Sequence, residues 1–371
     1  MSYFIVFTVS FAFAVLSVLR DSSKAIGIIC SGVAVVSLSV LNWIRDSTIG
    51  TDVLVYGNNL FATARASRYD FSFFLADCRT QHMSEYGCAL LNYVIAQFTG
   101  NVHVFYLLLG LCVNGIFYIA LFRIREIFYF PLAWLTFLLL IYPATLNLLR
   151  QGIALSLVLL MGSFALSRRY VSASVCVLVA YTFHHSSIFA LLILAFIVLI
   201  ERTDSIRIKN IIEIAFLFIS ALVPTFVGIL NRNGLLPDKY EQYVSAGDGG
   251  ISLVNAIVVR APFVILAVFY LLKDRASESN DNTERILLSL IAAESLLLPL
   301  QQMSSSTFRI ALYLGVFKTA GYAFICHRMN ILRPLAYALY VAYLLLYFYM
   351  QTVAGGSNGI YPFIRTSDSL V

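Results

Sequence analysis

Residues 170–200 read YVSASVCVLVAYTFHHSSIFALLILAFIVLI, and they include no Asp, Glu, Lys or Arg. Only the sequence FHHSS at 183–187 interrupts their apolar character. The stretch is long enough to cross a bilayer twice, as two helices of about 14 residues each, which are short compared with the usual ~20. A bend at this point brings His184 and His185 to one membrane face. Polar side chains between two apolar helices indicate a functional site.

The rest of the chain is equally apolar. Of its 371 residues, 60% are hydrophobic and 12% are charged, and the mean hydropathy is +0.85. Soluble domains carry about 25% charged residues. Runs without a charged side chain recur, for example 25–44, 101–122 and 127–149, and they do not alternate apolar with polar residues as a β-barrel would. The sequence predicts an all-α polytopic membrane protein, with residues 1–371 forming one integral membrane domain.

Basic residues predict the topology. Six short basic connections follow one another along the chain, and the positive-inside rule places each of them in the cytoplasm. They agree with one another only if the chain crosses the membrane twice between successive connections, which predicts about twelve transmembrane helices. The net charge of +6 then reflects topology and does not indicate a nucleic-acid partner. The predicted spans are 2–19, 25–43, 102–122, 127–143, 147–166, 170–183, 187–200, 210–230, 251–272, 286–301, 309–326 and 331–350; the connections carry Arg20/Lys24, Arg123/Arg125, Arg168/Arg169, Arg202/Arg207/Lys209, Lys273/Arg275/Arg285 and Arg328/Arg333.

This count requires that the apolar segment 86–99 does not cross the membrane. The segment is short and contains polar residues, so we expect an amphipathic helix on the outer, periplasmic surface. The outward side then carries a first loop, 45–101, and a second loop, 231–250. Cys78 and Cys88 share the first loop, and their spacing leaves open whether they form a disulfide.

Three arginines near the predicted outer face run against the positive-inside bias: Arg150, Arg260 and Arg309. A charge at membrane depth costs at least about 2.5–3.5 kcal/mol on insertion scales, so such residues usually face a polar cavity. The planar guanidinium suits a phosphate or pyrophosphate. Two simpler interpretations stay open: Arg260 extends to the lipid headgroups, and Lys318 pairs with Glu294 in a purely structural contact.

The first outer loop adds further candidates. Gly50 permits a tight turn, and Asp52 and Tyr56 lie four residues apart, which places both on one face of a short helix. Asp52 is then either a base or sugar ligand, or only a helix N-cap. Glu85 precedes the surface helix and is either a substrate ligand or that helix's N-terminal charge. A histidine in an apolar helix usually serves only packing. His184 is a functional candidate because it lies at the same predicted membrane face as the arginines.

These segments, taken in order, resemble the EpsG/Wzy family of bacterial polysaccharide polymerases. The similarity runs over about residues 45–315. Residues 50–56 are similar to the family's G-x-D-x-x-x-Y loop, and residues 84–87 are similar to its E-x-G/E-Y-G segment. Residues 150–154 are similar to its R-Q-x-I-A helix start, and residues 309–313 are similar to a later R-x-x-x-Y element. Residues 183–188 are similar to its F-H-x-S-x-I element, which assigns the motif histidine to His184.

The resemblance implies a multi-pass glycosyltransferase of the broad GT-C type in the bacterial inner membrane, with its site facing the periplasm or outside. Such an enzyme polymerises repeat units carried on undecaprenyl pyrophosphate, one as donor and one as acceptor, among membrane lipids and with a chain-length regulator protein as a further partner. We expect no cofactor and no metal. The catalytic candidates are Arg150, His184, Asp52 and Arg309; the substrate-binding candidates are Tyr56, Gln151, Arg260, His185, Tyr313 and Glu85.

Two rival functions share this chemistry. A flippase or other transporter of lipid-linked oligosaccharide also needs arginines in a cavity, although we find neither the internal repeat nor the paired broken helices typical of transporters. An O-antigen ligase, which transfers finished polymer to lipid A, uses the same kind of donor, and the sequence does not separate it from a polymerase.

Overall fold

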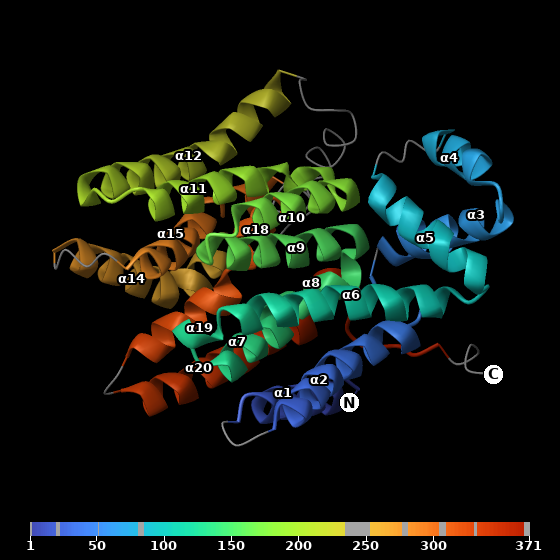
Figure 1. Ribbon diagram of the computed structural model, residues 1–371, viewed down its shortest axis with the longest axis horizontal. Helices are drawn as coiled ribbons and strands as arrows, with labels where there is room; N and C mark the ends of the chain where they lie inside the picture. The colour runs from blue at the N-terminus through green and yellow to red at the C-terminus, as the bar shows by residue number, and fades with distance from the viewer. Residues whose placement is uncertain are drawn as a thin grey trace.

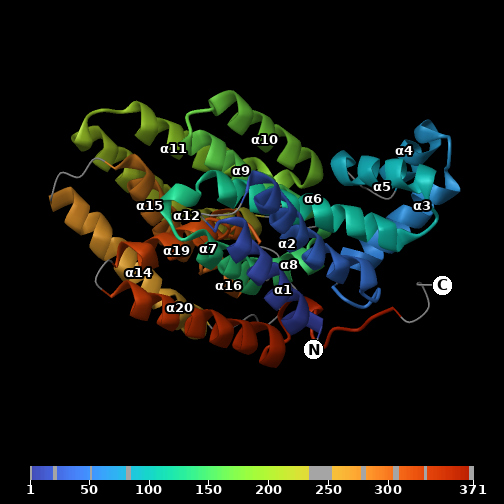
Figure 2. The same ribbon diagram turned by 60° about the horizontal axis from the view of Figure 1, so that its bottom comes forward.

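The computed structural model describes residues 2–19, 23–50, 52–80, 85–233, 253–276, 281–303, 309–329 and 332–366. Within these residues the chain is helical and forms no β-strand, which confirms the predicted all-α class. The long helices run roughly along the longest axis of the molecule, and three short helices, α3 (Leu60–Ala66), α4 (Phe71–Thr80) and α5 (Tyr86–Phe98), gather at one end (Figure 1 and Figure 2). We call this the loop end.

Among the residues that the structure describes, eight helical segments are long and apolar enough to cross a membrane. Two further apolar helices, α1 (Ser2–Ser17) and α10 (Tyr170–Phe183), are shorter. The predicted spans at 286–301 and 309–326 contain charged residues and shorter helices, so the count of twelve stays a prediction. The eight segments are Lys24–Ile44, Val102–Arg123, Phe130–Asn147, Leu149–Leu166, His185–Arg202, Ile206–Leu230, Ala256–Lys273 and Arg333–Ala354.

Helix ends follow local sequence signals. Side chains cap several starts: Ser23 accepts from the backbone of α2, and Asn101 accepts from the backbone of α6. Proline stands in the first turn of α7 and α20, where its missing N–H costs no hydrogen bond. The remaining bounds are α2 (Lys24–Ile44), η1 (Val53–Asn59), α6 (Val102–Arg123), η2 (Arg125–Ile127), α7 (Phe130–Thr136), η3 (Phe137–Ile141), α8 (Tyr142–Asn147), α9 (Leu149–Leu166), η4 (His185–Phe189), α11 (Ala190–Arg202), α12 (Ile206–Arg232), α14 (Leu253–Ala276), α15 (Asn282–Leu296), α16 (Leu300–Met303), α18 (Leu312–Gly315), α19 (Lys318–Arg328), α20 (Arg333–Phe348), η5 (Tyr349–Ala354) and η6 (Ser357–Gly359).

Helix α9 forms the centre of the bundle, because nearly all of its side chains are buried. It packs against α6 and α10 and also contacts α8 and α11. The sequence RQGIALS that opens it therefore lies among other helices, and Arg150 is held inside protein rather than in lipid.

Helix α11 turns into α12 at the end of the bundle opposite the loop end (Figure 1). Polar contacts join the helix ends beside five of the six basic connections to one another, across sequence-distant helices, whereas the topology built on these connections stays a prediction. Which side of the membrane this end faces stays a prediction. The contacts are Arg123 with Ser163, Arg168 with Glu201, Arg285 with Glu213, and Arg328 with Glu284.

A second set of buried charges lies between α14, α15 and α19. Glu294 accepts hydrogen bonds from Nε of Arg260 at 3.2 and 3.3 Å and from Nζ of Lys318 at 2.8 Å. The pairing of Lys318 with Glu294 confirms the structural interpretation. Arg260 belongs to the same cluster, where the buried carboxylate of Glu294 pairs with it, and its role in substrate binding stays a prediction.

Replacing Glu294 with glutamine should destabilise the protein strongly, by about 3–5 kcal/mol, because it leaves two buried cations without their counter-charge. The measurement is the unfolding transition of the purified protein in detergent. Glu126→Gln is the matched control: Glu126 is 83% exposed and pairs with Arg125, so its loss should cost at most about 1 kcal/mol. Equal stability of the two variants would contradict the prediction.

Candidate functional site

The first turn of α5 packs directly against the end of α10. A Cβ atom on Gly87 would lie 2.7 Å from Oγ1 of Thr182 and 2.9 Å from its carbonyl carbon and oxygen, so only glycine permits this approach. Glu85 stands two residues before Gly87, and His184 stands two residues after Thr182. The close packing of the two helix ends therefore brings the acidic and imidazole side chains together.

Glu85 occupies the N-cap position of α5, yet its carboxylate makes no capping bond. Instead, Oε1 accepts from Nδ1 of His184 at 2.7 Å, and Oε2 pairs with Nη1 of Arg150. The backbone N–H of His185 also donates to Oε1, at 3.3 Å. The side chains of Glu85 and Arg150 are each only 9% exposed. One buried carboxylate thus joins α5, α9 and the bend after α10.

Arg150 lies in the first turn of α9, where the helix dipole is positive and a cation is unfavourable without an anion nearby. Glu85 supplies that anion. The guanidinium carbon of Arg150 lies 3.3 Å from the centroid of the Tyr56 ring, a cation–π contact that connects α9 to η1. The adjacent Gln151 donates from Nε2 to the carbonyl oxygen of Arg309 at 2.8 Å. The backbone of Arg309 is therefore anchored beside Arg150.

The bend predicted at the histidines is confirmed. Helix α10 ends at Phe183, His184 is extended with φ −156° and ψ 113°, and η4 follows before α11. No glycine or proline explains this break; the bonds to Glu85 hold it. The ring of His185 stacks on Tyr181, with 4.7 Å between centroids, and Ser186 lies 3.2 Å from the hydroxyl of Tyr313.

The start of the 45–101 loop packs on the end of α8. Gly50 has a positive φ of +89°, as the predicted turn requires, and a Cβ there would lie 2.9 Å from Cα of Asn147. Asp52 is buried, and its backbone N–H points to Oδ1 of Asn147 at 3.5 Å. Asp52 makes no side-chain capping bond to η1, which does not support the N-cap interpretation. Sequence reasoning did not single out Asn147.

The structure thus brings together Glu85, Arg150, His184 and Tyr56, with Gln151, His185 and the backbone of Arg309 around them. The sequence did not predict the central position of Glu85. The feature that could have indicated it is the place of Glu85 at the start of the segment similar to E-x-G/E-Y-G. Cys78 and Cys88 are both free thiols. Among the described residues, no group of three or more His, Cys, Asp or Glu side chains is arranged to hold a metal ion.

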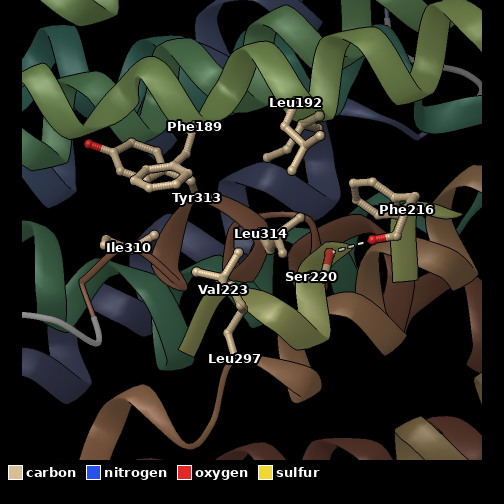
Figure 3. A pocket seen from close by; sticks show the side chains of 10 residues that line it. Phe189, Leu192, Phe216, Ser220, Val223, Leu297, Ile310, Tyr313 and Leu314 are labelled. Carbon is tan, nitrogen blue, oxygen red and sulfur yellow. Dashed lines mark hydrogen bonds between the residues drawn. The ribbon is translucent and has the colours of Figure 1, made fainter. Parts of the chain in front are cut away.

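An apolar crevice begins beside this site. It lies between α11, α12, α15 and the segment around α18, and Tyr313, which contacts Ser186, forms one wall (Figure 3). Ser220 is its one hydroxyl besides that of Tyr313, and Ser220 donates to a backbone carbonyl of its own helix. The crevice therefore offers a ligand almost only hydrocarbon surface. Its lining residues are Phe189, Leu192, Ile193, Phe216, Ser220, Val223, Leu297, Ile310, Tyr313 and Leu314.

The arrangement has a definite chemical capacity. An ionised carboxylate can only accept hydrogen bonds, so Nδ1 of His184 carries the proton and donates this hydrogen bond to Glu85. In the neutral imidazole, Nε2 is then the unprotonated nitrogen, which is the form that acts as a general base. Arg150 places positive charge within reach of the same carboxylate. The site therefore combines a base oriented by an acid with a buried cation.

A family model, described as the EpsG family, matches residues 28–364 of this chain. No curated protein and no solved structure matches it. All of the residues gathered around Glu85 lie inside the matched range.

A double-mutant cycle of Glu85→Gln and Arg150→Met tests the buried pair. Each single change should cost about 3–5 kcal/mol of unfolding free energy, because it removes one charge of a buried ion pair. The loss in the double variant should be about 1–3 kcal/mol smaller than the sum of the two single losses. Equilibrium unfolding in detergent measures this. Arg150→Met combined with the exposed Glu126→Gln should be additive, and additivity in the Glu85 cycle would contradict the contact.

Proposed function

Because the chain belongs to the EpsG family, the family of Wzy-type polysaccharide polymerases, we propose that it joins oligosaccharide repeat units carried on undecaprenyl pyrophosphate. The reaction takes place at the outer, periplasmic face of the bacterial inner membrane. The hydroxyl of one lipid-linked unit attacks the anomeric carbon of the glycan on a second lipid. A new C–O bond forms, and the bond from the anomeric carbon to the pyrophosphate oxygen breaks.

The observation that carries this proposal is the shared carboxylate of Glu85, which bonds His184 and Arg150 at once. His184 accepts the proton of the attacking hydroxyl at Nε2, while Glu85 holds the ring through Nδ1 and stabilises the imidazolium that forms. The direct bond to Glu85 favours His184 over Asp52 as the base. Asp52 lies buried beside the same loop, where it is suited to a sugar hydroxyl.

Arg150 serves the leaving group. As the glycosidic bond breaks, negative charge develops on the pyrophosphate oxygens, and a buried guanidinium at a helix N-terminus stabilises it without reorganisation. The backbone carbonyl of Arg309 accepts from Gln151, and we propose that the guanidinium of Arg309 supplies a second cation for the leaving group. The charges of Arg150, Arg309 and Glu85 sum to +1, and a net positive charge suits an anionic leaving group.

The apolar crevice supports a lipid-borne substrate. It begins at Tyr313, one hydrogen bond from Ser186 of the histidine segment, so a chain lying along it would place its pyrophosphate end near Arg150 (Figure 3). The space inside is only about 20 Å³, so a polyprenyl chain enters only if α11 and α12 separate from the segment around α18. We propose this crevice as the course of the lipid tail.

Arg150→Ala and Glu85→Gln should each collapse the surface polysaccharide ladder to single repeat units. Protein level and membrane insertion are measured in parallel, because both changes also remove a buried ion pair, and the ladder is compared at equal amounts of inserted protein. Loss of the oriented base or of the charge at the leaving group costs at least about 100-fold in rate. Arg68→Ala is the control, because the side chain of Arg68 donates to the carbonyl of Gln97 and lies over the ring of Tyr69, and neither of these residues belongs to the site. The measurement is gel electrophoresis of surface glycan from cells that carry each variant.

An unchanged ladder in both variants would contradict the proposed function. Loss of all surface glycan with repeat units trapped inside the cell would point instead to the transporter. Normal polymer length without attachment to lipid A would point to the ligase.

A further inference from the structure

A second cavity lies on the other side of η1 from Arg150. It is an open cleft of about 660 Å³, within the size range of small-molecule sites, where the ends of α2, α3 and α6 meet at the loop end (Figure 1). Helix η1 separates the two places: Tyr56 contacts Arg150, whereas Asn58, two residues further on, lines the cleft. The lining residues are Asp46, Ser47, Asn58, Phe61, Ala62, Arg65, Ala66, Gly100, Val102, His103, Tyr106 and Thr366.

The hydrogen bonds of the lining side chains determine which atoms serve a ligand. Nδ1 of His103 lies 2.7 Å from the carbonyl oxygen of Trp43, which only accepts, so Nδ1 is the donor and Nε2 is an acceptor in the neutral ring. The hydroxyl of Tyr106 lies 2.6 Å from Oδ1 of Asn58, so the amide nitrogen of Asn58 is the group left to donate.

Two charged groups complete the lining. The backbone N–H of Thr48 donates to Asp46, and its hydroxyl does so too, which holds the pKa of Asp46 below its usual value and keeps it a carboxylate acceptor. Arg65 donates one bond from Nη1 to the carbonyl of Ala96 at 3.0 Å and carries a positive charge at the cleft. The cleft therefore presents acceptors and donors together.

This mixture selects one ligand chemistry. A phosphate would suit Arg65 but would be repelled by Asp46, and a hydrocarbon chain would bury polar groups without partners. A sugar has vicinal hydroxyls that both donate and accept, and its C–H face packs on apolar surface such as Phe61 and Val102. A neutral oligosaccharide is the ligand that satisfies all of these groups.

We propose that this cleft binds the sugar residues of the acceptor repeat unit and presents their terminal hydroxyl across η1 to His184. The inference rests on the proposed polymerase function and adds to it the place where the acceptor glycan is held. The same short helix serves both places, because Asn58 lines the cleft and Tyr56 contacts Arg150.

The experiment measures binding of the neutral oligosaccharide released by mild acid from the lipid-linked pool of the producing cells, which carries neither lipid nor pyrophosphate. The full-length protein is purified in detergent, and saturation-transfer NMR or calorimetry gives the affinity. His103→Asn keeps a donor for Trp43 but removes Nε2, and Asp46→Asn removes the carboxylate. Each should weaken binding about tenfold, the effect of one charged or well-placed hydrogen bond.

Two further variants make the result decisive. Ala62→Trp fills the cleft from an exposed position without breaking a described hydrogen bond, and it should abolish binding. Asp70→Asn is the matched control, because Asp70 accepts hydrogen bonds from Ser72 and Phe73 much as Asp46 accepts from Thr48. Asp70 lies outside the cleft, so this variant should bind the oligosaccharide as tightly as the wild type does.

Unchanged binding in the three cleft variants would overturn the inference, as would displacement of the oligosaccharide by inorganic pyrophosphate, which would show an anion site. The surface polysaccharide ladder of cells that carry Arg150→Ala tests the proposed polymerase function separately. If that ladder collapses while the cleft variants bind oligosaccharide normally, the polymerase function is supported and the acceptor site is wrong. If the ladder persists while the cleft binds oligosaccharide, the glycan site is supported and the polymerase function is wrong.

Discussion

The carboxylate of Glu85 is the interaction on which the site depends. Three otherwise separate parts of the chain meet at this carboxylate: the 45–101 loop through α5, the buried α9 through Arg150, and the bend after α10 through His184. A buried cation at a helix N-terminus is costly alone, and a break in an apolar helix without proline or glycine is also costly. The single carboxylate offsets both costs, because its two oxygens bond both groups.

The two sets of buried charges differ in composition and therefore in use. Glu294 binds the guanidinium of Arg260 and the ammonium of Lys318, two group types whose ordinary pKa values lie well above the neutral range. Glu85 binds one guanidinium and one imidazole, and imidazole does exchange protons in that range. In both clusters one carboxylate binds two partners. The Glu294 cluster is a structural contact, whereas the Glu85 cluster is a candidate acid–base site.

Much of the fold was predictable from the sequence. The all-α class, the helix at residues 86–99 and the break at the histidines follow from apolar runs and from polar residues inside them, which are local signals. Charge placement was less predictable. Arg150 and Arg260 have similar sequence contexts, each an arginine in an apolar run, yet Arg150 pairs with Glu85 and Arg260 with Glu294. The partner depends on which helices become neighbours, and single-sequence periodicity does not contain that information.

The sequence by itself determined that this is a helical membrane protein with conspicuous polar residues at 52–56, 85, 150–151, 184–185 and 309, because hydrophobicity and charge act residue by residue. Only the tertiary structure decided that Glu85, and not Asp52, contacts His184 and Arg150, and that Asn58 and His103 share a cleft. Those choices depend on the close packing of α5 against α10 at Gly87, a contact between segments about a hundred residues apart. Packing of that kind is a property of the assembled bundle and of no single segment.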